Sequence, residues 1–304
     1  MKIKISTYYH SLVYDIMDYD SSEESTVRIQ YASDLHLEFE PERIEFEDIL
    51  LNVHGKENVY LVLAGDIGTL TELPVLRRFL EYCSQNWHKV FYIPGNHEYY
   101  HYDFDEANAY LKSLCNECNV IFALFDSYRI SRKFSRDIVI IMTTLWSYIP
   151  EHNARVVESK LNDYKLISKN KRKITSRTVN EIHQDQRSRL QCAVSSLRKE
   201  AHGNIETIVF THHSPYPKGT SDPTYENNNP ADINNTNCAF SSDCSDIMQE
   251  GVSQWIYGHT HYNPSFHNIN TLKISGTIIR SNQRGYVESE CDGYSSTDAI
   301  ITLK

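Results

Sequence analysis

The chain has little cysteine, no long apolar run and a deficit of positive charge. Its 304 residues include seven cysteines, an odd number at low density, which excludes a disulfide-stapled scaffold and favours a reducing compartment. No apolar run approaches the roughly 18 residues that a membrane span requires. The first residues contain no apolar segment of the kind found in signal peptides. We therefore expect a soluble, cytoplasmic protein with no membrane partner.

The charge balance narrows the choice of partners. Lys and Arg number 30 against 40 Asp and Glu, which gives a formal net charge of −10. An acidic surface does not attract nucleic acid broadly, so we do not expect nucleic acid as a partner. If the substrate is an anion, a local positive charge must attract it, and a bound metal ion is one source. The lone CxxC, at Cys115 and Cys118, has no second pair with which to complete a zinc site.

The chain is rich in apolar segments that are typical of strands, and these alternate with segments typical of helices. Hydrophobic residues make up 40% of it, enough for one large core. The early alternation predicts an α/β fold with parallel pairing, and the strand-rich end predicts a second, mixed sheet. The expected strands cover 27–33, 59–65, 89–96, 119–124, 137–146, 205–213, 253–258, 271–275, 277–281 and 297–303. The expected helices cover 74–87, 103–117, 176–202 and about 239–250.

Two segments differ in character from the rest. Residues 1–26 contain a polar run and are interpreted as an N-terminal extension, which leaves 27–304 as a single domain. Residues 147–204 are polar, rich in Lys, Arg and Gln, and mostly helical in pattern. We interpret this second segment as an insertion in the domain.

Metal-binding residue types recur where the expected strands end. In open α/β sheets, ligands bind at the carboxyl ends of the strands. A single Asp or His at such a place is more often a helix cap, a turn residue or a solvated side chain. Recurrence at five strand ends in one chain favours a common site instead. The residues concerned are Asp34, His36, Asp66, Asn96, His97, Glu98, His212, His213, His259 and His261.

The spacing and chemistry of these residues agree with a metal site. In Asp34-x-His36 and in His259-x-His261, an extended backbone would point both side chains to the same side. Glycines at 65, 95 and 258 precede the polar residues and allow sharp turns and close approach. Carboxylate, amide and imidazole donors without thiolate suit Mn, Fe, Zn or Ni. The ligands are too many for one ion, but they suit two ions about 3.5–4 Å apart that share a carboxylate.

The order D-x-H, GD, GNHE, H and GHTH, over residues 34–261, resembles the calcineurin-like metallophosphoesterases. The resemblance implies a four-layer α-β-β-α sandwich of two mixed sheets. It also implies which residues hold the two metals. One metal is assigned to Asp34, His36, Asp66 and His261, and the other to the shared Asp66 with Asn96, His212 and His259. His97 is implied as the general acid or as a phosphate-binding imidazole.

Further segments, such as "SDLHLEF" and "FSSDCSDIM", are similar to those of a bacterial-type subgroup of small cytoplasmic members. In that subgroup the insertion, here about 147–204, is a helical cap over the site. One position departs from the family pattern. Some members carry an Asp that orients the catalytic His, and Thr69 stands there in this chain. Glu98 or a backbone group is the expected substitute.

The sequence and the resemblance together predict a binuclear, metal-dependent hydrolase of phosphate esters. A metal-bridging hydroxide would attack a small phosphorylated substrate while His97 protonates the leaving oxygen. We expect manganese to serve in vitro. His213 is expected to support the adjacent ligand strand, and with Asn96 and Arg284 it is a candidate substrate contact. Candidates to line the pocket, with core packing as the alternative for the tyrosines, are Asp163, Tyr164, Arg284 and Tyr286.

The sequence leaves three alternative functions open. The fold could bind metal as a non-catalytic protein scaffold, which the intact GNH motif disfavours. It could be a nuclease, which the acidic composition and the lack of a basic groove disfavour. It could also be a hydrolase with one metal. The sequence leaves monoester or diester specificity, the native metals and the oligomeric state undecided.

Overall fold

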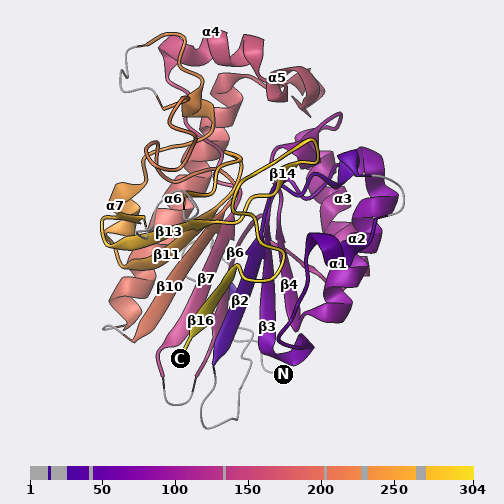
Figure 1. Ribbon diagram of the computed structural model, residues 1–304. Coiled ribbons are helices and arrows are strands. Elements are labelled where there is room, and N and C mark those ends of the chain that lie inside the picture. Colours follow the sequence, from indigo (N-terminus) through magenta and orange to yellow (C-terminus); the bar gives the residue numbers. More distant parts are fainter. Residues whose placement is uncertain are drawn as a thin grey trace.

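Two large β-sheets pack face to face between two layers of helices (Figure 1). The computed structural model describes residues 13–14, 26–40, 44–132, 135–201, 204–226, 232–264 and 272–304. The layer order is helices, sheet, sheet, helices, and both sheets are mixed. The four-layer α-β-β-α sandwich predicted from the resemblance is therefore confirmed.

The first sheet has five strands and carries the N-terminal motifs. Strands β2 to β5 run parallel, while the C-terminal strand β16 pairs antiparallel with β2. Every residue of β3 is buried, because both faces of the sheet are covered. In sheet order the strands are β16 (Ile300–Leu303), β2 (Val27–Ala32), β3 (Val59–Ala64), β4 (Lys89–Ile93) and β5 (Ile121–Phe122).

The second sheet has seven strands and carries the C-terminal motifs. Its central strands β7, β10, β11 and β13 are parallel, and antiparallel pairs flank them. Strand β1 lies in the expected N-terminal extension and pairs with β6; the rest of 1–25 lies outside the described residues. In sheet order the strands are β1 (Val13–Tyr14), β6 (Phe125–Ile130), β7 (Asp137–Thr143), β10 (Ile205–Thr211), β11 (Val252–Tyr257), β13 (Thr277–Ser281) and β12 (Lys273–Ile274).

Each sheet is covered on its outer face by its own helices (Figure 1). Helices α1 (Phe46–Ile49), α2 (Leu73–Asn86) and α3 (Phe104–Glu117) cover the five-stranded sheet. Helices α6 (Ser176–Ala201) and α7 (Ser245–Met248) cover the seven-stranded sheet. Among the described residues, no helix combines the length and the apolar character needed to cross a bilayer.

Short elements complete the chain. The 3₁₀ helices are η1 (Leu37–Phe39), η2 (Lys56–Asn58), η3 (Leu70–Glu72), η4 (His97–Tyr99) and η5 (Asn237–Ala239). Two small hairpins pair β8 (Ser168–Lys169) with β9 (Arg172–Lys173), and β14 (Gly285–Tyr286) with β15 (Ser289–Glu290).

A continuous apolar layer joins the two sheets. Ile29 and Val62 of the first sheet and Ile140 and Phe210 of the second are fully buried in it. Apolar area removed from water stabilises the fold by about 25 cal/mol per Å², so this layer fixes the two sheets against each other. Their relative placement decides how loops from different sheets meet.

The segment between β7 and β10 contributes helices to two regions of the molecule. Helices α4 (Glu151–Lys160) and α5 (Asp163–Leu166), here called the cap helices, lie together at the top of the view in Figure 1. Helix α6 starts nearby and packs its later turns on the seven-stranded sheet through Leu190, Val194 and Leu197. The boundaries 147–204 of the cap insertion stay a prediction.

Two expected elements differ from the structure. The predicted strand 119–124 is only two residues long, because Asn119 adopts a left-handed backbone, and the chain then pairs as β6. The predicted helix 239–250 is split into η5 and α7. Ser241 forms a strand-like bridge with Ser214, and the Asp243 side chain accepts a hydrogen bond from Ser245 N (2.9 Å) at the start of α7. These local polar contacts compete with a continuous helix.

Candidate metal centre

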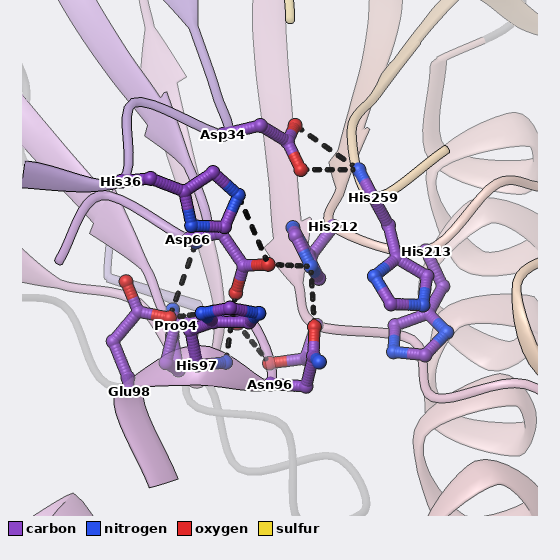
Figure 2. Close-up of polar contacts among 12 residues, drawn as sticks. Asp34, His36, Asp66, Pro94, Asn96, His97, Glu98, His212, His213 and His259 are labelled. Atoms are coloured by element: carbon purple, nitrogen blue, oxygen red, sulfur yellow. Dashed lines mark hydrogen bonds and ion pairs between the residues drawn. The ribbon is translucent and has the colours of Figure 1, made fainter. Parts of the chain in front are cut away.

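The loops after β2, β3, β4, β10 and β11 meet at one point and bring the predicted ligands together (Figure 2). Two groups each offer three ligand atoms that lie within 4.8 Å of one another. The outer group is Asp34, His36 and His261, and the inner group is Asp66, His212 and His259. Asn96 adjoins the inner group, with Oδ1 3.1 Å from His212 Nε2.

The donor atoms of the two groups face one another closely. His36 Nε2 lies 3.0 Å from His261 Nε2, and His261 Nε2 lies 3.5 Å from Asp34 Oδ1. Asp66 Oδ2 lies 3.5 Å from His212 Nε2 and 4.0 Å from His36 Nε2, so it reaches both groups. Imidazole nitrogens and carboxylate oxygens that converge in this way form a donor set for divalent cations. The residues present therefore fit a metal centre.

The backbone at the ligands is left-handed, not extended. Asp34, His36, Asp66, His259 and His261 have φ angles of 55°, 48°, 52°, 72° and 50°. The expectation that an extended backbone aligns each D-x-H and H-x-H pair is thus wrong. Left-handed non-glycine residues cost of order 1–3 kcal/mol each and persist where their surroundings fix them. Here the turn after each strand redirects the side chains into the centre.

Three glycines permit the close approach that the sequence predicted. A Cβ on Gly258 would lie 2.6 Å from Asp34 Oδ2, and the other two glycines approach ligand residues as closely. Gly65 has φ +89°, and a Cβ there would lie 2.3 Å from His212 Nδ1. A Cβ on Gly95 would lie 2.2 Å from Asp66 Oδ1. A side chain at any of the three positions would displace a ligand residue.

Neighbouring groups hold several of the other ring nitrogens and carboxylate oxygens. His212 Nδ1 lies 3.0 Å from Ala64 O, so it donates a hydrogen bond there and leaves Nε2 directed at Asp66. His36 Nδ1 lies 3.2 Å from Glu38 Oε1 and donates to it. Asp34 accepts from His259 N at 2.9 and 3.1 Å. Such contacts fix the tautomer and the orientation of metal ligands.

The charges of the cluster suit a cation. Burial raises the pKa of Asp34 and Asp66, but the facing imidazoles outweigh burial and hold both pKa values below their ordinary range. Burial lowers the pKa of His259 well below its ordinary value, and His213 and His212 act in the same direction. Burial also lowers the pKa of His212, but Asp66 outweighs burial and raises it to about 9, so a cation that binds there would displace a proton from this imidazole. Ionised carboxylates and a neutral imidazole are the ligand forms that metals require.

His97 lies beside the ligand groups at the start of η4 (Figure 2). Its backbone N donates to Asp66 Oδ1 (2.9 Å), and its Nδ1 lies 2.9 Å from Glu38 Oε1. Burial lowers the pKa of His97, but Asp66 and Glu38 outweigh burial and raise it to about 9. These carboxylates therefore favour the protonated imidazole, and Glu38 orients it.

Glu38 is a residue that the sequence reasoning missed. Thr69, at the family's orienting position, bonds Thr71 Oγ1 instead. Glu98, the expected substitute, accepts from Gly95 N (2.7 Å), Asp66 N (3.1 Å) and Ile67 N (2.8 Å), so it ties the β3 and β4 loops together. The sequence signal that could have identified Glu38 is its position two residues after His36, as a second carboxylate in the same motif.

A cavity of about 430 Å³ opens over the ligand groups. Its wall combines ligand residues, cap residues and aromatic rings. The lining residues are Asp66, Asn96, His97, Tyr100, Lys160, Leu161, Asn162, Asp163, Ser221, Tyr225, Thr236, Asn237, Phe240, His259, Thr260, His261 and Tyr286. Asp163 and Tyr286 thus line the pocket as expected, whereas Tyr164 packs in the apolar core.

Two candidate substrate contacts lie apart from this cavity lining. Arg284 pairs with Glu40 and with Glu290 (2.8 Å), and its backbone N donates to Ser33 O. His213 is buried behind His259, with ring centroids 4.1 Å apart, and its Nδ1 lies 3.0 Å from Ser147 Oγ (Figure 2). These contacts brace the Asp34 and His259 loops respectively.

Comparison with known proteins agrees with this geometry. The family model for calcineurin-like phosphoesterases matches residues 27–263. The chain belongs to this family. A curated relative, "Uncharacterized protein L509" of Acanthamoeba polyphaga mimivirus, is 32% identical over 276 residues, which cover 85% of this chain and 91% of the relative.

Two solved structures are similar to this chain to different degrees. The phosphopantetheinyl hydrolase of Mycobacterium tuberculosis has a TM-score of 0.59 and 17% identity, over 87% of this chain and 91% of the other. A dimetal phosphatase from Danio rerio has a TM-score of 0.46 and 14% identity, over 88% and 90%. The first of these likenesses supports the fold.

Proposed function

We propose that the protein is a binuclear metallophosphoesterase that hydrolyses an ester of a small phosphorylated molecule. The observation that carries the proposal is the position of Asp66. Its Oδ2 lies 3.5 Å from His212 Nε2 of the inner group and 4.0 Å from His36 Nε2 of the outer group. One carboxylate in that position can bridge two cations.

In this proposal the outer group and the inner group each hold one ion. Asp66 is shared, and Asn96 adds its amide oxygen to the inner group. Bound divalent ions would polarise the phosphoryl oxygens and lower the pKa of water, which makes a nucleophile available near neutral pH. We propose manganese as the ion for assays in vitro and the cytoplasm as the location.

His97 is the proposed general acid. It lines the cavity. Its Nδ1 donates a hydrogen bond to Glu38, which leaves Nε2 to face the substrate. Burial lowers the pKa of His97, but the Glu38 carboxylate, 2.9 Å from Nδ1, raises it and so helps to keep the proton on the imidazole. A positioned acid that protonates a leaving oxygen contributes typically 10²–10⁴-fold in rate.

The cavity supports a small substrate over a polymer. Its volume of about 430 Å³ lies in the range of pockets for small molecules, roughly 300–1,000 Å³. The net charge of −10 disfavours a nuclease, because polynucleotide binding relies on many positive groups. A complete ligand set together with His97 disfavours the scaffold alternative.

The test combines metal analysis with a panel of phosphate esters. Purified protein is loaded with Mn²⁺, and its metal content is measured by inductively coupled plasma mass spectrometry. Hydrolysis of para-nitrophenyl phosphate and of its bis ester is then followed, alongside phosphopantetheine esters, which the name of the mycobacterial protein suggests. We expect two ions per chain and metal-dependent turnover. Asp185→Asn, an exposed change on α6, is the matched control and should behave as the parent.

Each alternative has its own outcome. The absence of both stoichiometric metal and turnover would refute the proposal. Two bound ions without turnover on any ester would favour the scaffold, and one ion per chain would favour a mononuclear hydrolase. Salt-dependent binding and cleavage of single-stranded DNA would favour the nuclease.

A further inference from the structure

A carboxylate from the cap helices reaches the inner ligand group. Asp163 begins α5, and its Oδ1 accepts hydrogen bonds from Asn96 Nδ2 (2.9 Å) and from Tyr100 OH (2.8 Å). Asn96 Nδ2 also donates to Tyr100 OH at 3.2 Å. Asp163, Asn96 and Tyr100 are buried, although all three line the cavity. The contact joins residues 67 positions apart in the sequence.

This contact decides which end of the Asn96 amide faces the ligands. The oxygen and nitrogen of an amide are nearly the same in shape, so the partners of each end set its orientation. Asp163 Oδ1 accepts a hydrogen bond from Tyr100 OH and faces the Asn96 amide at 2.9 Å, so the nitrogen end of that amide is the end that can donate to it. The Oδ1 end then points at the inner group, 3.1 Å from His212 Nε2, where it can serve as a ligand.

We propose that Asp163 is a positioning residue that couples docking of the cap helices to metal binding at the inner group. The inference rests on the proposed function, because it requires that the inner group hold an ion. When the cap helices are docked, Asn96 presents an oxygen to the metal. When they are not, the amide is free to present either end. Linkage is reciprocal, so an ion at the inner group also favours the docked cap.

The chain provides a control for general loosening of the cap. Glu158 lies on α4 and accepts hydrogen bonds from Ser176 N and Oγ, both at 2.8 Å, at the start of α6. Glu158→Ala therefore weakens the attachment of the cap helices without touching Asn96. Asp163→Ala removes the carboxylate, and Asp163→Asn keeps its shape while adding an N–H₂ that can face Asn96.

The first experiment measures Mn²⁺ at each position. Apo-protein is titrated with Mn²⁺, and anomalous diffraction at the manganese edge gives the occupancy of each ligand group in crystals grown at limiting Mn²⁺. For Asp163→Ala we expect inner-group affinity to fall by about 10–100-fold, the usual cost of losing an outer-shell partner, with the outer group unchanged. Asp163→Asn should lose less, and so should Glu158→Ala, which loosens the cap helices but keeps the Asp163 contact that orients Asn96.

The second experiment measures how metal binding changes the hydrogen exchange of the cap helices. Hydrogen exchange of 151–166 is compared with and without Mn²⁺. Exchange in the parent and in Glu158→Ala should slow when Mn²⁺ binds, whereas exchange in Asp163→Ala should not respond. Inner-group occupancy in both Asp163 variants within twofold of the parent would overturn the inference, and so would an equal loss in Glu158→Ala. A parent protein that binds no metal would overturn the proposed function as well, which separates the two failures.

Discussion

The inner and outer ligand groups share a carboxylate and differ in how they are enclosed. Asp66, His212 and His259 of the inner group are 2%, 0% and 8% exposed. In the outer group Asp34 and His36 are fully buried, but the His261 side chain is 24% exposed. Partners from the sheets and the cap helices hold the inner group, whereas Glu38 and the segment after β13 hold the outer group.

The difference indicates that the two ions would exchange with solvent at different rates. Water and chelators reach a metal through its exposed ligands, so the outer ion should leave first. An ion at the inner group would be enclosed by side chains whose orientation depends on Ala64, His213 and Asp163. Four changes to the chain test this asymmetry, from the largest expected effect to the smallest.

Asp66→Asn should remove the asymmetry, because it weakens both groups together. Loss of the shared charge should lower turnover by roughly 10³-fold, since metal ions supply several kcal/mol of transition-state stabilisation and each 1.36 kcal/mol is tenfold. Metal content and kcat are the measurements. Asp34→Asn is the matched control and should empty the outer group alone. An Asp66→Asn protein that retains one ion in full would show that Asp66 is not shared.

His97→Ala should leave both groups occupied and affect chemistry alone. We expect kcat to fall by about 10²–10⁴-fold for alkyl phosphates, which need a proton on the leaving oxygen. The loss should be smaller for para-nitrophenyl phosphate, whose leaving group is stable as an anion. Metal content and kcat on the two esters are compared. Equal losses on both esters would place the general acid elsewhere.

Glu38→Gln should weaken the outer group and the proposed acid together, because Glu38 contacts both His36 and His97. We expect about a 10–100-fold loss of turnover, with a lower Mn²⁺ occupancy at the outer group only. At saturating Mn²⁺, where the outer group is filled in every variant, the double variant with His97→Ala should lose little more than His97→Ala alone on alkyl phosphates. Additive losses would mean that Glu38 acts independently of His97.

Gln283→Ala should loosen the outer group slightly. Gln283 Oε1 accepts from His261 N (2.7 Å), and its Nε2 donates to Tyr262 O (2.8 Å), so it fixes the His261 loop. Removing it should speed loss of the outer ion to EDTA by a few-fold and cost about 1–3 kcal/mol of stability through unpaired backbone groups. Gln254→Ala, on β11 away from the ligands, is the control. Faster loss of the inner ion than of the outer ion would show that Gln283 supports the inner group and not the outer one.

The sequence by itself determined an α/β fold with a second, mixed sheet and the chemical types of the ligands, whereas the order of the four layers followed from the family resemblance. Fully apolar strands such as β3 are encoded locally, because burial on both faces requires apolar residues at every position. The ligands follow such strands directly, so their order along the chain was readable as well. The close approach at Gly65 and Gly95 was also predictable, because only a residue without a Cβ fits there.

The tertiary structure alone decided which polar groups support the ligands. From the sequence, Glu98 or a backbone group was the expected substitute for the orienting group that Thr69 lacks, and only the packing of the loops placed Glu38 against His97 instead. Arg284 was expected at the substrate and is instead paired with Glu40 and Glu290. Asp163 reaches Asn96 from a distant helix. Hydrogen bonds act over about 3 Å in space, and sequence patterns report only the periodicity of a single element, so these contacts become visible only when the elements are assembled.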